Sequence, residues 1–207
     1  MEKKGKRPAV DQGALHPEFI VGIGGSAGAL NAYKALLNAL PSDTAMAFVI
    51  ISHMNPTANS QLASILSRHT KMPLQVASMA MPILANHVYI IPPNVDLHIE
   101  DYRFKVISPR SAGLKQIDVF FASLAAEMGA RAIGIVLSGY DGDGTEGCKH
   151  IKAKGGTTFA QDASAEVDFM PLSVQAAGVA DFVIPLDEIP AKLKSLAAAL
   201  NKLETTK

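Results

Sequence analysis

FIVGIGGSAG, at Phe19–Gly28, is an apolar run that ends in glycines around a single serine, Ser26. A pattern with apolar residues along one helical face follows directly over Ala29–Leu40. The stretch therefore predicts a buried strand, a tight turn at Ser26 and a helix. Because glycine accepts backbone angles that other residues resist and leaves room for a ligand beside the main chain, we expect this turn to carry a site.

The same strand–turn–helix pattern occurs twice more along the chain. Longer apolar strands are expected at Ala45–Ser52 and Ala132–Leu137, each followed by a polar or glycine-rich loop and a helical pattern. Further short strands and a closing helix are expected at Leu74–Ala77, Val88–Ile91, Thr157–Ala160, Ala180–Ile184 and Ile189–Leu203. The alternation predicts an α/β fold with a doubly wound, mostly parallel sheet flanked by helices, a Rossmann-like three-layer sandwich.

One segment departs from that alternation. Val95–Ser108 contains two short runs of alternating polarity, DLHIE and RFKVIS, which are joined at Asp101–Tyr102. Such a pair of runs predicts an antiparallel β-hairpin.

Length and composition restrict the class of protein. The 207 residues, 48% of them hydrophobic, can form one good-sized core, and we expect a flexible leader over 1–18 and a single domain over 19–203. The chain has 19 lysine and arginine residues and 19 aspartate and glutamate residues, so it has no overall positive charge that would attract nucleic acid. The single cysteine, Cys148, and the lack of a long apolar run or a secretory signal favour a cytoplasmic protein without membrane insertion.

Two motifs overlap at the first turn. Gly22-x-Gly24-x-x-Ala27 matches a dinucleotide-binding fingerprint, whereas Gly24-x-Ser26-x-Gly28 matches the nucleophile elbow of serine hydrolases. A dinucleotide site needs an acidic residue at the end of the second strand to bind the ribose. His53 stands at that place, and the nearest carboxylate, Asp43, precedes the strand. We therefore expect no NAD or FAD cofactor.

Three expected strands are followed by residues of types that can take part in catalysis. In open α/β sheets, ligands bind beyond the carboxyl ends of the strands, where this chain places Ser26, His53 and a loop with Asp141 and Asp143. A serine hydroxyl becomes a good nucleophile when an imidazole takes its proton, and a carboxylate orients that imidazole. The sequence predicts a catalytic triad of Ser26, His53 and Asp143, with the backbone N–H of Ala27 as a candidate oxyanion donor.

Plainer interpretations exist for each of these residues. Ser26 could cap the following helix, His53 could be an ordinary loop histidine, and Asp143 could form a turn with its glycine. The chain order also differs from α/β-hydrolases, in which the histidine follows the acid, because only His150 follows Asp143 and it lies among lysines. The remaining histidines, His16, His69, His87 and His98, have no ligand spacing, so we expect no metal site.

These residues resemble the catalytic domain of chemotaxis protein-glutamate methylesterases (CheB-type), which remove methyl groups from receptor glutamates. The resemblance covers about residues 19–196 and rests on IVGIGGSAGAL, VIISHMNP, VYIIPPNVDL, GIVLSGYDGDGTEG and GTTFAQDASAEVDFMPLSV. It implies that the family nucleophile falls on Ser26, the histidine on His53 and the aspartate on Asp143. The second half is most similar to the esterase domains of fused esterase–methyltransferase (CheB/CheR) proteins.

The chain departs from the family pattern in two places. The acid loop of the family commonly reads LTGMGNDG or LSGTGSDG, so Tyr140, Asp141 and Gly142 differ here, and Asp141 is a reserve candidate for the acid. At the two positions before the Ile-Asp pair, where the family usually has a basic residue and a proline, this chain has Lys115 and Gln116. These differences concern the oxyanion geometry and the contacts with substrate.

A phosphoacceptor receiver domain precedes the esterase domain in the family's common form, and an 18-residue leader cannot encode one. We therefore expect no regulation by phosphorylation within these 207 residues. Three interpretations stay open: a constitutive esterase, a domain of a longer fusion, and an enzyme controlled by a separate receiver or methyltransferase domain.

The resemblance implies that the domain over 19–203 hydrolyses glutamate γ-methyl esters on cytoplasmic helices of chemoreceptors, and also deamidates receptor glutamines. Two alternatives stay open on the residues alone. One is a serine esterase that acts on small molecules, which the same triad would support. The other is a catalytically silent module that binds receptor helices or a signalling kinase.

Overall fold

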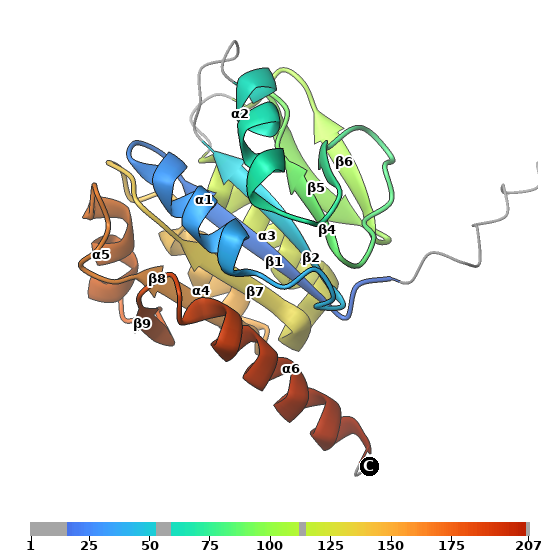
Figure 1. Ribbon diagram of the computed structural model, residues 1–207, viewed down its shortest axis with the longest axis vertical. Coiled ribbons are helices and arrows are strands. Elements are labelled where there is room, and N and C mark those ends of the chain that lie inside the picture. The colour runs from blue at the N-terminus through green and yellow to red at the C-terminus, as the bar shows by residue number, and fades with distance from the viewer. Residues whose placement is uncertain (1–15, 53–58, 112–114, 206–207) are drawn as a thin grey trace, which may run out of the picture.

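The computed structural model describes residues 16–52, 59–111 and 115–205, and its centre is a seven-stranded parallel sheet (Figure 1). The strand order is β3-β4-β2-β1-β7-β8-β9. The strands are β1 (Phe19–Gly25), β2 (Met46–Ser52), β3 (Leu74–Val76), β4 (His87–Ile90), β7 (Ala132–Val136), β8 (Thr157–Gln161) and β9 (Phe182–Ile184). From β1 the chain builds outward through β2 on one side and then returns to place β7 on the other, so the sheet has its switch point between β1 and β7.

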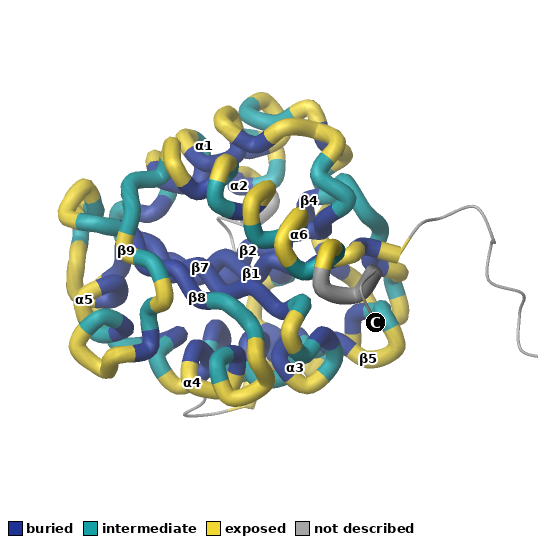
Figure 2. The backbone as a smooth tube through the Cα atoms, turned by 90° about the horizontal axis from the view of Figure 1, so that it is seen from below, coloured by how far each residue is buried: buried dark blue, intermediate teal, exposed yellow. Residues whose placement is uncertain are grey.

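Helices cover both faces of this sheet. One face carries α1 (Ala29–Ala39), α2 (Asn59–Leu66) and α6 (Ile189–Thr205), and the other carries α3 (Gln116–Met128), α4 (Thr145–Ala153) and α5 (Phe169–Ala176) (Figure 2). Short 3-10 turns extend α2 at Ser67–His69 and α3 at Gly129–Arg131. The prediction of a doubly wound three-layer α/β sandwich is confirmed.

An antiparallel hairpin lies beside the sheet, as predicted. Strands β5 (Asp96–Glu100) and β6 (Arg103–Ile107) pair with Glu100 opposite Arg103. The two turn residues between them have φ angles of 51° and 55°, which suits the two-residue turns that match the twist of a hairpin. The hairpin is attached to α3, because the N–H of Ile99 donates to the Ser123 hydroxyl at 3.2 Å.

Two helices were not predicted from the sequence: α3 and α5. The signal for α3 was present, since its buried apolar residues repeat at helical spacing, at Ile117, Phe120, Phe121, Leu124 and Met128. α5 has only eight residues and begins two residues before a proline, Pro171, so its periodicity is too short to recognise.

The glycines of β1 make room for α3. A Cβ atom at Gly22 would lie 2.7 Å from Phe121 Cε1, and one at Gly24 would lie 2.6 Å from Ile117 Cγ2. These two glycines therefore serve the close packing of a helix against the strand, and not the approach of a ligand as the motif suggested.

Among the described segments, no helix is both long enough and apolar enough to cross a membrane. The division of the chain into a leader over 1–18 and a domain over 19–203 stays a prediction.

Candidate active site

Ser26 lies between the end of β1 at Gly25 and the start of α1 at Ala29, in the predicted turn. The N-cap of α1 is Gly28, whose φ of 75° is in the left-handed region that glycine tolerates, and no side chain caps the helix. Among the residues that the structure describes, none hydrogen-bonds to the Ser26 hydroxyl, whereas the backbone C=O of Ser26 accepts the N–H of Ala29 at 3.1 Å. The capping interpretation of Ser26 is therefore wrong, and the residue is partly exposed.

Ser138, which follows β7, fixes the position of the Ser26 turn. Its C=O accepts the N–H of Ser26 at 2.9 Å, and its hydroxyl donates to the C=O of Ala27 at 2.9 Å. The same hydroxyl accepts the N–H of Val167 at 2.9 Å. Ser138 is fully buried, so one side chain holds the turns after β1 and β7 and the segment before α5 together.

Gly139 continues this contact between the two strand ends. A Cβ atom at Gly139 would lie 3.1 Å from Ser26 Cβ and 1.8 Å from the sulfur of Met170. The N–H of Met170 donates to the C=O of Gly139 at 3.0 Å. The start of α5 is thus attached to the loop that lies directly against the nucleophile candidate.

Asp143 is fully buried and receives backbone N–H groups from two helix N-termini. Its Oδ2 accepts the N–H of Ile117 at 3.0 Å, and its Oδ1 accepts the N–H of Asp118 at 2.9 Å. The N–H of Gly144, the N-cap of α4, also donates to Oδ1 at 2.8 Å. Donors of this kind and the positive ends of α3 and α4 stabilise a buried carboxylate in its charged form and fix its orientation.

Asp118, in the first turn of α3, is a second carboxylate next to Asp143. Its Oδ1 accepts the N–H of Gly144 and the N–H of Gly147, both at 2.8 Å, and so it supports the start of α4. Burial and the negative charge of Asp143 raise the pKa of the Asp118 carboxyl to about 6, although the donated N–H bonds and Lys115 oppose this shift. The carboxylates of Asp118 and Asp143 therefore both accept a hydrogen bond from the one backbone N–H of Gly144.

The other predicted residues lie as follows. Asp141, the reserve acid, is exposed, and its Oδ1 accepts the N–H of Asp143 at 3.0 Å, a contact that shapes the turn. The Tyr140 side chain is 73% exposed. His150 is exposed on α4. His53 lies outside the described residues, but β2 ends one residue before it, and Ser52 pairs with Gly25 at the same edge of the sheet.

The structure thus brings Ser26 and Asp143 to the carboxyl edge of the sheet at its switch point. Ile117 contacts both strand ends: its side chain packs against Gly24 in β1, and its backbone N–H donates to Asp143 Oδ2. The sequence did not reveal that Ser138 holds the Ser26 turn or that Asp118 supports the start of α4, because both depend on contacts between segments far apart in the chain.

Among the described residues, no group of three or more histidine, cysteine, aspartate or glutamate side chains could hold a metal ion.

The protein is therefore an α/β domain in which a turn with Ser26 follows the central strand, β1, and the buried carboxylate of Asp143 follows the neighbouring strand, β7. The family model described as CheB methylesterase matches residues 21–193. The chain belongs to the CheB methylesterase family.

Relatives of known name support the same assignment. The protein-glutamate methylesterase/protein-glutamine glutaminase 2 of Burkholderia pseudomallei is 35% identical over 189 residues, which make up 89% of this chain and 55% of that protein. A putative protein-glutamate methylesterase/protein-glutamine glutaminase of Leptospira interrogans is 32% identical over 179 residues, 84% of this chain and 92% of that protein. The chain therefore spans about half the length of the Burkholderia relative and nearly all of the Leptospira one.

A solved structure agrees in fold. The crystal structure of the Thermotoga maritima CheB methylesterase catalytic domain superposes with a TM-score of 0.80 at 28% identity, covering 86% of this chain and 98% of that chain. The parallel sheet, the flanking helices and the antiparallel hairpin are thus those of a CheB catalytic domain.

Proposed function

We propose that residues 19–203 form a catalytic domain that hydrolyses glutamate γ-methyl esters on the cytoplasmic helices of chemoreceptors and releases methanol. The observation that supports this most is the pairing of the Ser26 turn with the buried Asp143 at one edge of a CheB-family fold. The names of the relatives support deamidation of receptor glutamines as a second activity of the same site. A cytoplasmic location follows from the proposed substrate.

The proposed reaction begins when His53 takes the proton of Ser26 and the Ser26 oxygen attacks the ester carbonyl carbon. Asp143 orients His53 and stabilises the imidazolium that forms. The N–H of Ala27 has no hydrogen-bond partner among the described residues, so it can donate to the oxyanion. The C–O bond to the methoxy group then breaks, and methanol leaves with the proton from His53.

The second half of the reaction restores the enzyme. Water, deprotonated by His53, attacks the acyl carbon, and the bond to Ser26 breaks as the serine takes its proton back. The product is a free glutamate side chain. With glutamine as substrate, the same steps release ammonia in place of methanol.

The test is methanol release from a methylated chemoreceptor fragment, measured beside hydrolysis of short acyl esters. Release from the receptor fragment at a rate far above that of the short esters supports the methylesterase, whereas fast hydrolysis of short esters alone would favour a small-molecule esterase. No turnover of either by folded protein would favour a silent binding module. Addition of a phosphorylated receiver domain to the same assay tests control by a separate partner.

Asp143→Asn is the informative variant for the acid. It removes the charge, and because both carboxyl oxygens accept backbone N–H groups, either orientation of the amide turns its NH2 toward a donor. We expect methanol release to fall by about 10⁴-fold, as for the corresponding acid of serine proteases. Unchanged methanol release from the folded variant would remove Asp143 from the proposed triad.

A further inference from the structure

Gln161 is a buried amide at the carboxyl end of β8, on the same edge of the sheet as Ser26. It is 3% exposed and comes one residue after the last register pair of β7 with β8, Val136 with Ala160. Its Oε1 accepts the N–H of Ser138 at 3.2 Å. Since the pairing of the two strands has ended there, the Gln161 side chain supplies the acceptor that this buried N–H needs.

The other end of the Gln161 amide is bonded to the loop after β8. Its Nε2 donates to Ser164 Oγ at 3.3 Å, and the Ser164 hydroxyl donates to Asp162 Oδ1 at 2.5 Å. Because a backbone N–H can only donate, the amide oxygen of Gln161 faces Ser138 and the NH2 group faces Ser164. The three hydrogen bonds therefore run in one direction, from the Ser138 N–H to the Asp162 carboxylate, and hydrogen bonds in such a chain strengthen one another.

Ser138 connects this chain of hydrogen bonds to the candidate nucleophile. Its C=O accepts the N–H of Ser26 at 2.9 Å, and its hydroxyl donates to the C=O of Ala27 at 2.9 Å. Gly139, the next residue, lies against the Ser26 side chain. A rotation of the Ser138 backbone would therefore shift the turn that carries the proposed nucleophile and the candidate oxyanion donor.

The rate of attack on an ester depends on small displacements of the nucleophile. A misplacement of about 1 Å, caused by a residue far from the reacting atoms, can lower a rate by about 10²-fold. Within the described part of the chain, no group hydrogen-bonds to the Ser26 hydroxyl, so these residues place it through the main chain of its turn. What holds that main chain should therefore affect the rate.

We propose that Gln161 is a positioning residue for the Ser26 nucleophile. Oriented by Ser164, it fixes Ser138, and through Ser138 it fixes the turn with Ser26 and Ala27. Because Gln161 acts through Ser138 and not through contact with the substrate, its effect should appear in kcat and not in KM. This inference rests on the proposed methylesterase function and adds to it a residue that controls the rate of attack.

The test compares the wild-type protein with Gln161→Leu, Gln161→Glu and a matched control, Thr158→Val. Gln161→Leu removes both hydrogen bonds of the amide, whereas Gln161→Glu keeps an acceptor for the Ser138 N–H. For each protein, kcat and KM of methanol release from a methylated receptor fragment are measured beside the rate at which a fluorophosphonate labels Ser26. Urea denaturation reports the stability of each variant.

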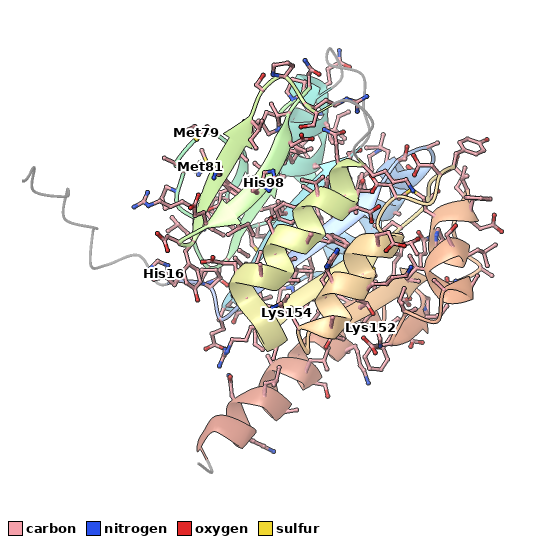
Figure 3. All side chains as sticks on the ribbon, turned by 180° about the vertical axis from the view of Figure 1, so that it is seen from behind. His16, Met79, Met81, His98, Lys152 and Lys154 are labelled. Carbon is pink, nitrogen blue, oxygen red and sulfur yellow. The ribbon has the colours of Figure 1, made fainter. Side chains whose placement is uncertain are left out.

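Thr158 is the matched control because it is fully buried on the same strand, near the opposite end. Its hydroxyl donates to the C=O of Val179 and accepts the N–H of Asp181 at 3.2 Å. Asp181 also pairs with Lys152, which lies near the end of α4 that is remote from Asp143 (Figure 3). Thr158→Val therefore removes buried hydrogen bonds from β8 without touching the chain of bonds to Ser138.

We expect Gln161→Leu to lose at least about tenfold in kcat, with a parallel loss of labelling rate and with KM within about twofold of the wild type. Gln161→Glu should recover most of both rates. Thr158→Val should unfold at a lower urea concentration but match the wild type in kcat and labelling. Wild-type rates in folded Gln161→Leu would overturn the positioning role, and so would equal losses in Thr158→Val, which would make the effect one of general stability.

Ser164→Ala keeps the proposal testable if Gln161→Leu does not fold, since Ser164 is exposed. It removes the hydroxyl that accepts from Gln161 Nε2, so kcat and labelling rate should fall by about two- to tenfold; wild-type rates would contradict the proposal. If the wild type is labelled at Ser26 but releases no methanol, the methylesterase function fails. The labelling rates of the variants then still decide whether Gln161 positions Ser26.

Discussion

Asp118→Asn is a substitution whose effect on stability should depend on pH with a definite sign. In the wild type, burial and the charge of Asp143 raise the pKa of the Asp118 carboxyl from 3.8 to about 6. The folded protein therefore binds a proton at Asp118 more tightly than the unfolded chain does. The stabilisation that this proton gives is complete below about pH 4 and is lost as the pH rises through about 6.

The magnitude follows from the shift and from the exposure of the side chain. A rise of the pKa from 3.8 to about 6 would correspond to about 3 kcal/mol, but Asp118 is only half-buried, so solvent screening reduces the expected effect on the free energy of unfolding to about 1 kcal/mol. Asparagine retains the Oδ1 acceptor for both Gly144 and Gly147, because both N–H groups donate to that one atom in the wild type. Asp118→Asn should therefore raise the free energy of unfolding by about 1 kcal/mol at pH 8 and change it little at pH 4.

Urea denaturation of both proteins between pH 4 and pH 8 measures this difference, read as the change in midpoint at constant m-value. Asp118→Ala is the control, since it removes the acceptor of the Gly147 N–H and should destabilise the protein at every pH by about 1–3 kcal/mol. A difference between wild type and Asp118→Asn that does not vary with pH would refute the reasoning, and so would a less stable asparagine variant at pH 8.

Two further predictions concern residues that position the site. Ser138→Ala removes a buried hydroxyl that serves both Ala27 and Val167, so the free energy of unfolding should fall by about 2–4 kcal/mol and fluorophosphonate labelling of Ser26 should slow; a variant of wild-type stability would contradict this. Gly24→Ala places a methyl group 2.6 Å from Ile117 Cγ2, so it should destabilise the fold by about 1–3 kcal/mol. It should also lower methanol release, because the N–H of Ile117 donates to Asp143, the proposed acid of the triad; thermal denaturation and the methanol assay check both effects.

The sheet and hairpin were predictable because their signals are local. The buried strand Phe19–Gly25 and the turn at Asp101 and Tyr102 are each specified by apolar runs and turn residues that are close together in the sequence. Alternation of strands and helices then leaves few topologies for the parallel sheet. The candidate residues Ser26 and Asp143 could be found in the same way, since each follows an apolar strand.

The residues that hold the candidate site together could not be found from local patterns. Ser138 acts through contacts with Ala27 and Val167, which are 111 and 29 residues away in the chain. Two partners of Asp143 are the N–H groups of Ile117 and Asp118 in α3, a helix that was not predicted, 26 and 25 residues earlier. Main-chain donors carry no signature in the residue type, so only the fold reveals which carboxylate they surround.

The most direct test of the central claim is the rate of methanol release from a methylated chemoreceptor fragment by Ser26→Ala, measured beside the wild type and with folding checked by denaturation. If the Ser26 oxygen attacks the ester, the variant should lose about 10³-fold or more of the wild-type rate, as nucleophile variants of serine hydrolases do. Methanol release at the wild-type rate from folded Ser26→Ala would contradict the account.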